Sequence, residues 1–263
     1  MNLVFYLLAI GIGIITGGMT SLIGASGVMI IVPILTMFFK VGVHAAIGTS
    51  LFVDVIASLT VSYSYYKNGN IDLKSGVWIA LTSVIGAQLG ASFANKMEEG
   101  KLSSSFGIFL VIGGLSMFYN SFKGKNDSLD TVRGFIHFKR EWQKILAVLI
   151  TGLGIGILSG LFGAGGGVMV LLALIILMSF PLHKAIGTST LIMAITAFSS
   201  TVGYAARGNI SLILGSFLAG GAVLGGILGS RYANKVNERT LQSAVGICFM
   251  AMGIVMTVIA IIK

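Results

Sequence analysis

The chain carries the stretch HAAIGTS at residues 44–50 and the stretch HKAIGTS at residues 183–189, which places the two copies 139 residues apart. Several polar and glycine matches at one separation are not expected by chance between two apolar sequences, so the chain is predicted to consist of two homologous halves. Three further matches share the same separation: Leu22-Ile23-Gly24-Ala25 with Leu161-Phe162-Gly163-Ala164, Gly69-Asn70-Ile71 with Gly208-Asn209-Ile210, and Ala94-Asn95-Lys96 with Ala233-Asn234-Lys235.

The composition places these halves in a lipid bilayer. Of the 263 residues 56% are hydrophobic and 10% are charged, whereas a soluble domain carries about 25% charged residues. We therefore predict an all-α polytopic membrane protein whose apolar segments form the helices. Segments 27–39 and 167–180 are short for a span, which needs about 20 residues, and are predicted to be short or re-entrant. The apolar segments are 3–23, 27–39, 44–66, 73–94, 103–121, 144–163, 167–180, 184–206, 211–233 and 241–262.

The basic residues indicate how the halves are connected. The formal charge is +9, but the Lys and Arg residues lie between apolar segments, which is typical of cytoplasmic loops and argues against nucleic-acid binding. We predict a first repeat at 1–121, a basic cytoplasmic linker at 122–143 and a second repeat at 144–263. Five crossings in each half place most Lys and Arg residues inside, so inverted repeats in the inner (plasma) membrane are favoured.

A glycine-rich turn precedes the short segment of each half and is the first candidate for a substrate site. A helix that follows such a turn presents free N–H groups and a positive dipole end, which suits an anion. The alternative is a tight turn between closely packed helices. The candidate residues are Gly24, Ala25, Ser26 and Gly27 in the first half, and Gly163, Ala164, Gly165, Gly166 and Gly167 in the second.

Small hydroxyl residues of the repeated stretch are the second candidate. Thr49 and Ser50 in the first half, with Thr188 and Ser189 in the second, could donate hydrogen bonds to an oxyanion. They could equally hold helices together, because small polar residues are common at membrane helix interfaces. The preceding His44 and His183 are expected to bond backbone carbonyls, with proton sensing as the alternative.

Asp54 is the most unusual residue of the apolar segments. It lies within 44–66, and its counterpart at the repeat separation is Met193. A carboxylate inside a membrane is costly and is a functional hypothesis by default, so we predict a coupling role for Asp54, with a structural polar contact as the alternative. The spacing G-x-x-x-G at Gly86–Gly90 and Gly225–Gly229 predicts close helix packing. No metal site, cofactor motif or catalytic constellation is predicted.

The stretch Gly156–Gly167, followed by Ala185–Ser189 and Arg207–Ile210 and by the glycine-rich run 220–229, resembles the TauE/SafE sulfite exporter family of membrane proteins. Val32-Pro33-Ile34-Leu35 is similar to the V-P-x-L run of that family, whereas the second half reads Leu172-Ala173-Leu174 at the matching place and the first glycine turn is shorter. The resemblance implies transport, often export, of small sulfur-containing anions such as sulfite or organosulfonates.

The sequence therefore predicts a transporter of small anions that works by alternating access, with the anion between the two glycine turns. Two other classes stay open at this stage. One is an anion channel and the other is a membrane scaffold without transport activity. An enzyme is disfavoured because the chain lacks a nucleophile–base pair or a metal-ligand pattern.

Overall fold

The computed structural model describes residues 3–23, 26–122, 141–162, 167, 169–171, 174, 180, 182–232, 247, 250–251, 253–255 and 257–258. These residues form helices and turns, and none of the described residues lies in a strand. The helices are α1 (Leu3–Ile23), α2 (Val28–Met37), α3 (Val43–Lys67), α4 (Leu73–Ala94), α5 (Glu99–Phe122), α7 (Glu141–Phe162), α9 (Leu182–Ala205) and α10 (Leu212–Tyr232). The predicted all-α membrane fold is confirmed.

The helix bounds follow the apolar segments closely, with two instructive differences. Helices α5 and α7 begin four and three residues before the predicted segments, at Glu99 and Glu141. Their first turns are polar, so hydropathy alone misses them, and α7 begins inside the predicted linker. Within the described part of the chain, three stretches are long and apolar enough to cross a bilayer, namely Val43–Lys67, Lys184–Ala205 and Leu212–Arg231. Helix α2 has 10 residues, which corresponds to about 15 Å.

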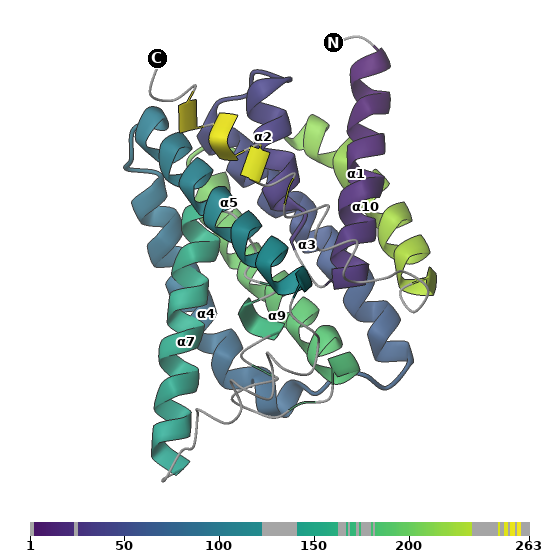
Figure 1. Ribbon diagram of the computed structural model, residues 1–263, viewed down its shortest axis with the longest axis vertical. Coiled ribbons are helices and arrows are strands. Elements are labelled where there is room, and N and C mark those ends of the chain that lie inside the picture. Colours follow the sequence, from purple (N-terminus) through teal and green to yellow (C-terminus); the bar gives the residue numbers. More distant parts are fainter. Residues whose placement is uncertain are drawn as a thin grey trace.

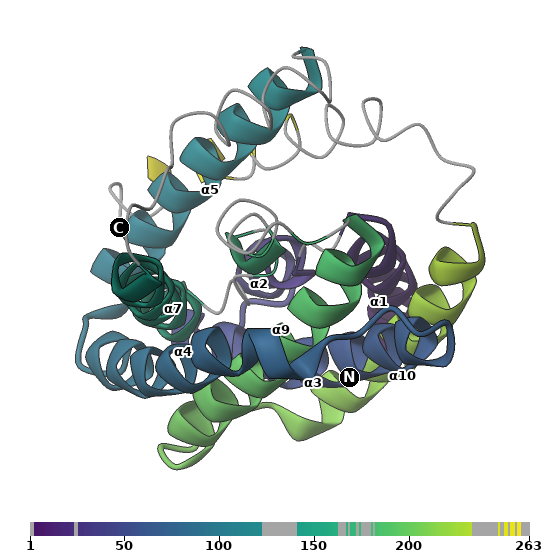
Figure 2. The same cartoon turned by 90° about the horizontal axis from the view of Figure 1, so that it is seen from below.

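The first helix of each half packs against the fourth helix of the other half. Helix α1 of the first half packs along α10 of the second, and α4 packs in the same way along α7. Helices α3 and α9 cross between these two pairs, α2 packs against α3, and α5 lies beyond α2 on the same side of α3 and α9 (Figures 1 and 2). At the repeat separation α1 matches α7, α3 matches α9 and α4 matches α10. The α1–α10 and α4–α7 pairs are therefore equivalent contacts.

Glycines allow the helices of the α1–α10 and α4–α7 pairs to touch through their backbones. A Cβ atom at Gly86 or Gly90 of α4 would overlap the carbonyl oxygen of Leu153 or Ile157 on α7. At the matching place on α10, a Cβ atom at Gly225 would overlap the backbone of Ile14 on α1. Such close approach is the reason for small residues at membrane helix interfaces. The predicted packing role of the two G-x-x-x-G spacings is confirmed.

The third helix of each half ends in the same turn. Gly69 and Gly208 have φ values of 70° and 71°, which is a left-handed conformation that glycine adopts without strain. The N–H of Gly69 donates to Tyr66 O and that of Asn70 to Tyr65 O, and the N–H groups of Gly208 and Asn209 repeat this pattern. This is a Schellman ending, in which two successive N–H groups cap the last carbonyls of a helix. The repeated Gly-Asn-Ile motif thus reverses the chain after α3 and α9.

Candidate functional site

Each repeated Gly-Thr pair holds the Schellman turn of the opposite half. Thr49 Oγ1 accepts a hydrogen bond from the Ser211 N–H at 2.8 Å, and Thr188 Oγ1 accepts one from the Asp72 N–H at 3.0 Å. We call these contacts the first clasp (Gly48 and Thr49 with residues 209–211) and the second clasp (Gly187 and Thr188 with residues 70–72). Residues 49 and 72 lie 139 residues before 188 and 211, so the clasps are reciprocal.

The glycine of each clasp permits the approach of a backbone carbonyl. A Cβ atom at Gly48 would overlap Asn209 O and lie 3.0 Å from Tyr204 Cβ, while at Gly187 it would overlap Asn70 O and lie 3.0 Å from Tyr65 Cβ. The start of α3 therefore meets the end of α9, and the start of α9 meets the end of α3. These two matched helices pack antiparallel.

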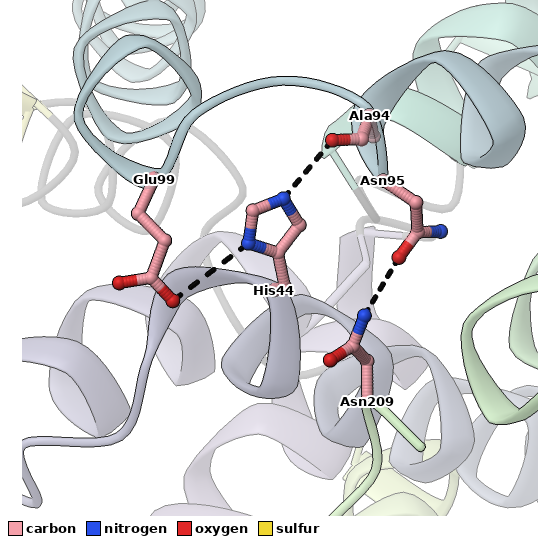
Figure 3. A network of polar contacts seen from close by, with 5 residues as sticks. All are labelled: His44, Ala94, Asn95, Glu99 and Asn209. Atoms are coloured by element: carbon pink, nitrogen blue, oxygen red, sulfur yellow. Dashed lines mark hydrogen bonds and ion pairs between the residues drawn. The ribbon is translucent and has the colours of Figure 1, made fainter. Parts of the chain in front are cut away.

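Further polar contacts support each clasp, but they differ between the halves. Beside the first clasp, Asn209 Nδ2 donates to Asn95 Oδ1 at 2.7 Å, and a ring nitrogen of His44 is 3.0 Å from Ala94 O, with Glu99 3.7 Å from the other nitrogen (Figure 3). The predicted carbonyl contact of His44 is confirmed; the side chain of His183 lies outside the described residues.

Beside the second clasp, Lys184 Nζ forms an ion pair with Asp72 Oδ2 at 3.3 Å. The first half has Ala45 where the second has Lys184, and the second half has Ser211 where the first has Asp72. This ion pair therefore has no counterpart at the first clasp.

The four predicted hydroxyl residues are buried and have protein partners. Ser50 Oγ donates to Ala46 O at 2.6 Å and Ser189 Oγ to Ile186 O at 3.0 Å, each within its own helix. Thr49 and Thr188 contact the opposite half through the clasps, whereas Ser50 and Ser189 bond only within their own helices. Their substrate role stays a prediction.

The first glycine turn is described at Ser26 and Gly27, while Gly24 and Ala25 lie outside the described residues. The Val28 N–H donates to Ser26 Oγ at 3.3 Å, and a Cβ atom at Gly27 would press on the Thr16 side chain of α1. The turn thus places the N-terminal end of α2 among buried residues. Residues 163–166 of the second turn lie outside the described residues, and Gly167 is buried.

Asp54 lies beside the first turn. Its side chain is 2% exposed, in the middle of α3. The Ser26 hydroxyl and the Gly27 backbone N–H lie next to the carboxylate, yet among the described residues neither carboxylate oxygen has a hydrogen-bond partner. The polar groups beside Asp54 are thus those of the first glycine turn, and both its coupling role and the structural alternative stay predictions.

Two hydroxyl groups are also buried without a hydrogen-bond partner among the described residues, and they were not singled out from the sequence. Ser58 lies one helical turn after Asp54, and Ser159 lies four residues before the second glycine turn; their Oγ atoms are buried and lack a partner among the described residues. Buried polar atoms are nearly always paired, so each exception indicates a role such as ligand binding. The spacing of Ser58 from Asp54, and the position of Ser159 just before a glycine turn, were the available signals.

Asp54 thus lies beside the first glycine turn, and Ser159 precedes the second by four residues in the sequence. An anion at such a place could accept hydrogen bonds from hydroxyls and from free N–H groups at a helix start. Among the described residues, no group of three or more His, Cys, Asp or Glu side chains could hold a metal ion. The first glycine turn therefore combines a hydroxyl, a helix start and one buried acidic side chain.

Comparison with known proteins gives the context. The family model described as "Sulfite exporter TauE/SafE" matches residues 9–256. The probable membrane transporter protein YunE of Bacillus subtilis is 28% identical, over 94% of this chain and 96% of its own length. A probable membrane transporter protein of Methanocaldococcus jannaschii is 27% identical, over 95% of this chain and 94% of its own. No solved structure matches the chain significantly.

Proposed function

Because the chain belongs to the sulfite exporter TauE/SafE family, whose relatives are named as probable membrane transporters, we propose that it exports small sulfur-containing anions such as sulfite or organosulfonates across the plasma membrane. The observation that supports this proposal is that the buried polar atoms of Asp54, Ser58 and Ser159 lack partners among the described residues. Asp54 lies beside the first glycine turn, and Ser159 lies four residues before the second in the sequence. The proposed site lies between these turns, with Ser26 and Ser159 as hydroxyl donors and the α2 N-terminus as a positive end.

The proposed mechanism is alternating access between two inverted repeats. Antiparallel packing of the matched helices α3 and α9 supports inversion, because halves related by an axis along the membrane normal would have parallel matched helices. The reciprocal clasps support a two-fold relation, since each half gives the other the same contact. In this proposal the 1–121 and 144–263 repeats rock against each other, and the basic 122–143 linker faces the cytoplasm.

The test is flux of sulfite and of methanesulfonate in proteoliposomes, comparing the unaltered chain with Ser159→Ala. A hydrogen bond to a charged group contributes about 1.5–3 kcal/mol, so the half-saturating concentration should rise by about tenfold or more. Removal of an unpartnered buried hydroxyl should not destabilise the fold. Ser216→Ala, at an exposed hydroxyl of α10, is the matched control and should leave flux unchanged.

The outcomes separate the classes that the sequence left open. Saturable flux that is stimulated by anion on the opposite side supports a carrier, whereas flux that rises linearly with concentration indicates a channel. No flux of either anion by folded protein would contradict the proposed transport and favour a scaffold. Flux that Ser159→Ala does not change would keep the transporter and remove the second turn from the site.

A further inference from the structure

Asp54 is the only buried charged side chain among the described residues. Basic side chains do not neutralise it, and its carboxylate oxygens and the neighbouring Ser58 Oγ are unpartnered in the described part of the chain. An isolated ionised carboxylate in an apolar interior is costly, and it is relieved by a cation or by a proton. In the second half the matching residue is Met193, which is fully buried, so this property belongs to one half.

The position of Asp54 adds a second fact. The carboxylate lies beside Ser26 and the Gly27 N–H, at the start of α2. Negative charge is stabilised at a helix N-terminus, so an ionised Asp54 occupies the electrostatic position that a substrate anion would use. Two like charges at one helix end repel, and the low local dielectric strengthens this repulsion. A neutral Asp54 would therefore favour an anion next to the α2 N-terminus, and an ionised Asp54 would oppose it.

Among the described residues, other titratable groups do not supply a positive charge that would neutralise Asp54. Helix α2 has none. On the other helices that pack against α3, the described titratable or charged side chains lie in or near the terminal turns: Tyr6 on α1, Glu99 and Lys101 on α5, Lys184 and Tyr204 on α9, and Arg231 on α10. On α3 itself they are His44, Tyr63, Tyr65, Tyr66 and Lys67, all near its ends.

We propose that Asp54 carries a proton with the anion, so that the protein moves one proton in the same direction as each substrate anion. This inference rests on the proposed transport function and specifies its coupling. The proton joins a carboxylate oxygen of Asp54 when the anion enters, leaves on the opposite side with it, and restores the ionised carboxylate. A monoanion then crosses without net charge, and its flux follows the combined gradients of anion and proton.

The experiment uses proteoliposomes that contain a pH-sensitive dye, a gradient of methanesulfonate, and K⁺ with valinomycin to set the membrane potential. The unaltered chain should move one proton per anion, and its anion flux should not change with potential. Asp54→Asn should move anions with at least tenfold fewer protons, and its flux should become potential-dependent. Glu98→Gln, at an exposed acidic side chain, should keep the one-to-one ratio.

Anion flux by the unaltered chain without proton movement would overturn the coupling role alone, as would full proton movement by Asp54→Asn. Failure of folded, unaltered protein to move methanesulfonate or sulfite would overturn the proposed function and this inference with it. If Asp54→Asn does not fold, the proton-to-anion ratio of the unaltered chain decides, with one supporting the inference and zero overturning it.

Discussion

Helices α3 and α9 hold matching places in the two halves, and they agree at their starts but differ in their middles. At the starts, Gly48 and Thr49 receive a turn of the second half as Gly187 and Thr188 receive a turn of the first. One and two turns further on, α3 buries Asp54 and Ser58, where α9 buries Met193 and Ala197. The contacts that build the two-fold framework are duplicated, whereas the unpartnered polar groups of α3, Asp54 and Ser58, have apolar counterparts in α9.

Breaking the duplicated part should have the largest effect. Gly48→Ala and Gly187→Ala each introduce a Cβ atom that overlaps a backbone carbonyl of the opposite half. Overpacking costs about 1–3 kcal/mol, and backbone cannot move aside as a side chain can, so we expect the upper part of this range or loss of folded protein. The loss of stability is measured by thermal unfolding of each variant in detergent.

Gly11→Ala and Gly154→Ala are the controls, because a Cβ atom at either helical glycine meets nothing within 4 Å. They should be neutral or slightly stabilising, since Ala favours a helix over Gly by up to about 1 kcal/mol. Damage from only one of the two clasp substitutions would show that the clasps are not equivalent.

The clasp hydroxyls give a smaller effect. Thr49→Val and Thr188→Val remove the acceptors of the Ser211 and Asp72 N–H groups, and an unsatisfied buried donor costs about 1–3 kcal/mol. Both should lower the unfolding temperature by similar amounts, whereas Thr→Ser at either position should retain most of the stability. A raised half-saturating sulfite concentration at unchanged stability would instead support the substrate role predicted for these residues.

The ion pair between Lys184 and Asp72 should have the smallest effect. Its side chains are 41% and 28% exposed, and pairs of this kind contribute about 0.2–1 kcal/mol. Lys184→Met should lower the unfolding temperature slightly at low salt and less at high salt, because ions screen the pair. Lys101→Met, which removes a fully solvated pair with Glu98, should change nothing measurable; an equal effect would show that the second clasp gains nothing from its ion pair.

The sequence predicted much of the framework because hydropathy and repeat spacing record it directly. The segment 73–94 coincides with α4, and 44–66 differs from α3 by one residue at each end. The partners of the repeated stretch could not be predicted in the same way. Thr49 accepts a hydrogen bond from a backbone N–H 162 residues away, and a backbone group leaves no side-chain signal. The same hydroxyl types would suit an oxyanion equally well.

Asp54 was evident from the sequence because a charge inside an apolar run needs a reason. Ser58 and Ser159 were not, because a serine in a membrane helix usually donates to a carbonyl of its own helix, as Ser50 does. Only the three-dimensional surroundings show that these two hydroxyls remain unpartnered among the described residues.

The contacts of the first clasp also have a consequence for biosynthesis. Thr49 and Ser211 are separated by 162 residues, and a ribosome adds about 5–20 residues per second. The first half therefore spends on the order of ten seconds or more in the membrane before residues 209–211, which contact Gly48 and Thr49, have been synthesised. During that interval the surface at Gly48 and Thr49 lacks its partner from the second half, so a chain that ends before residue 211 should be less stable than the full chain.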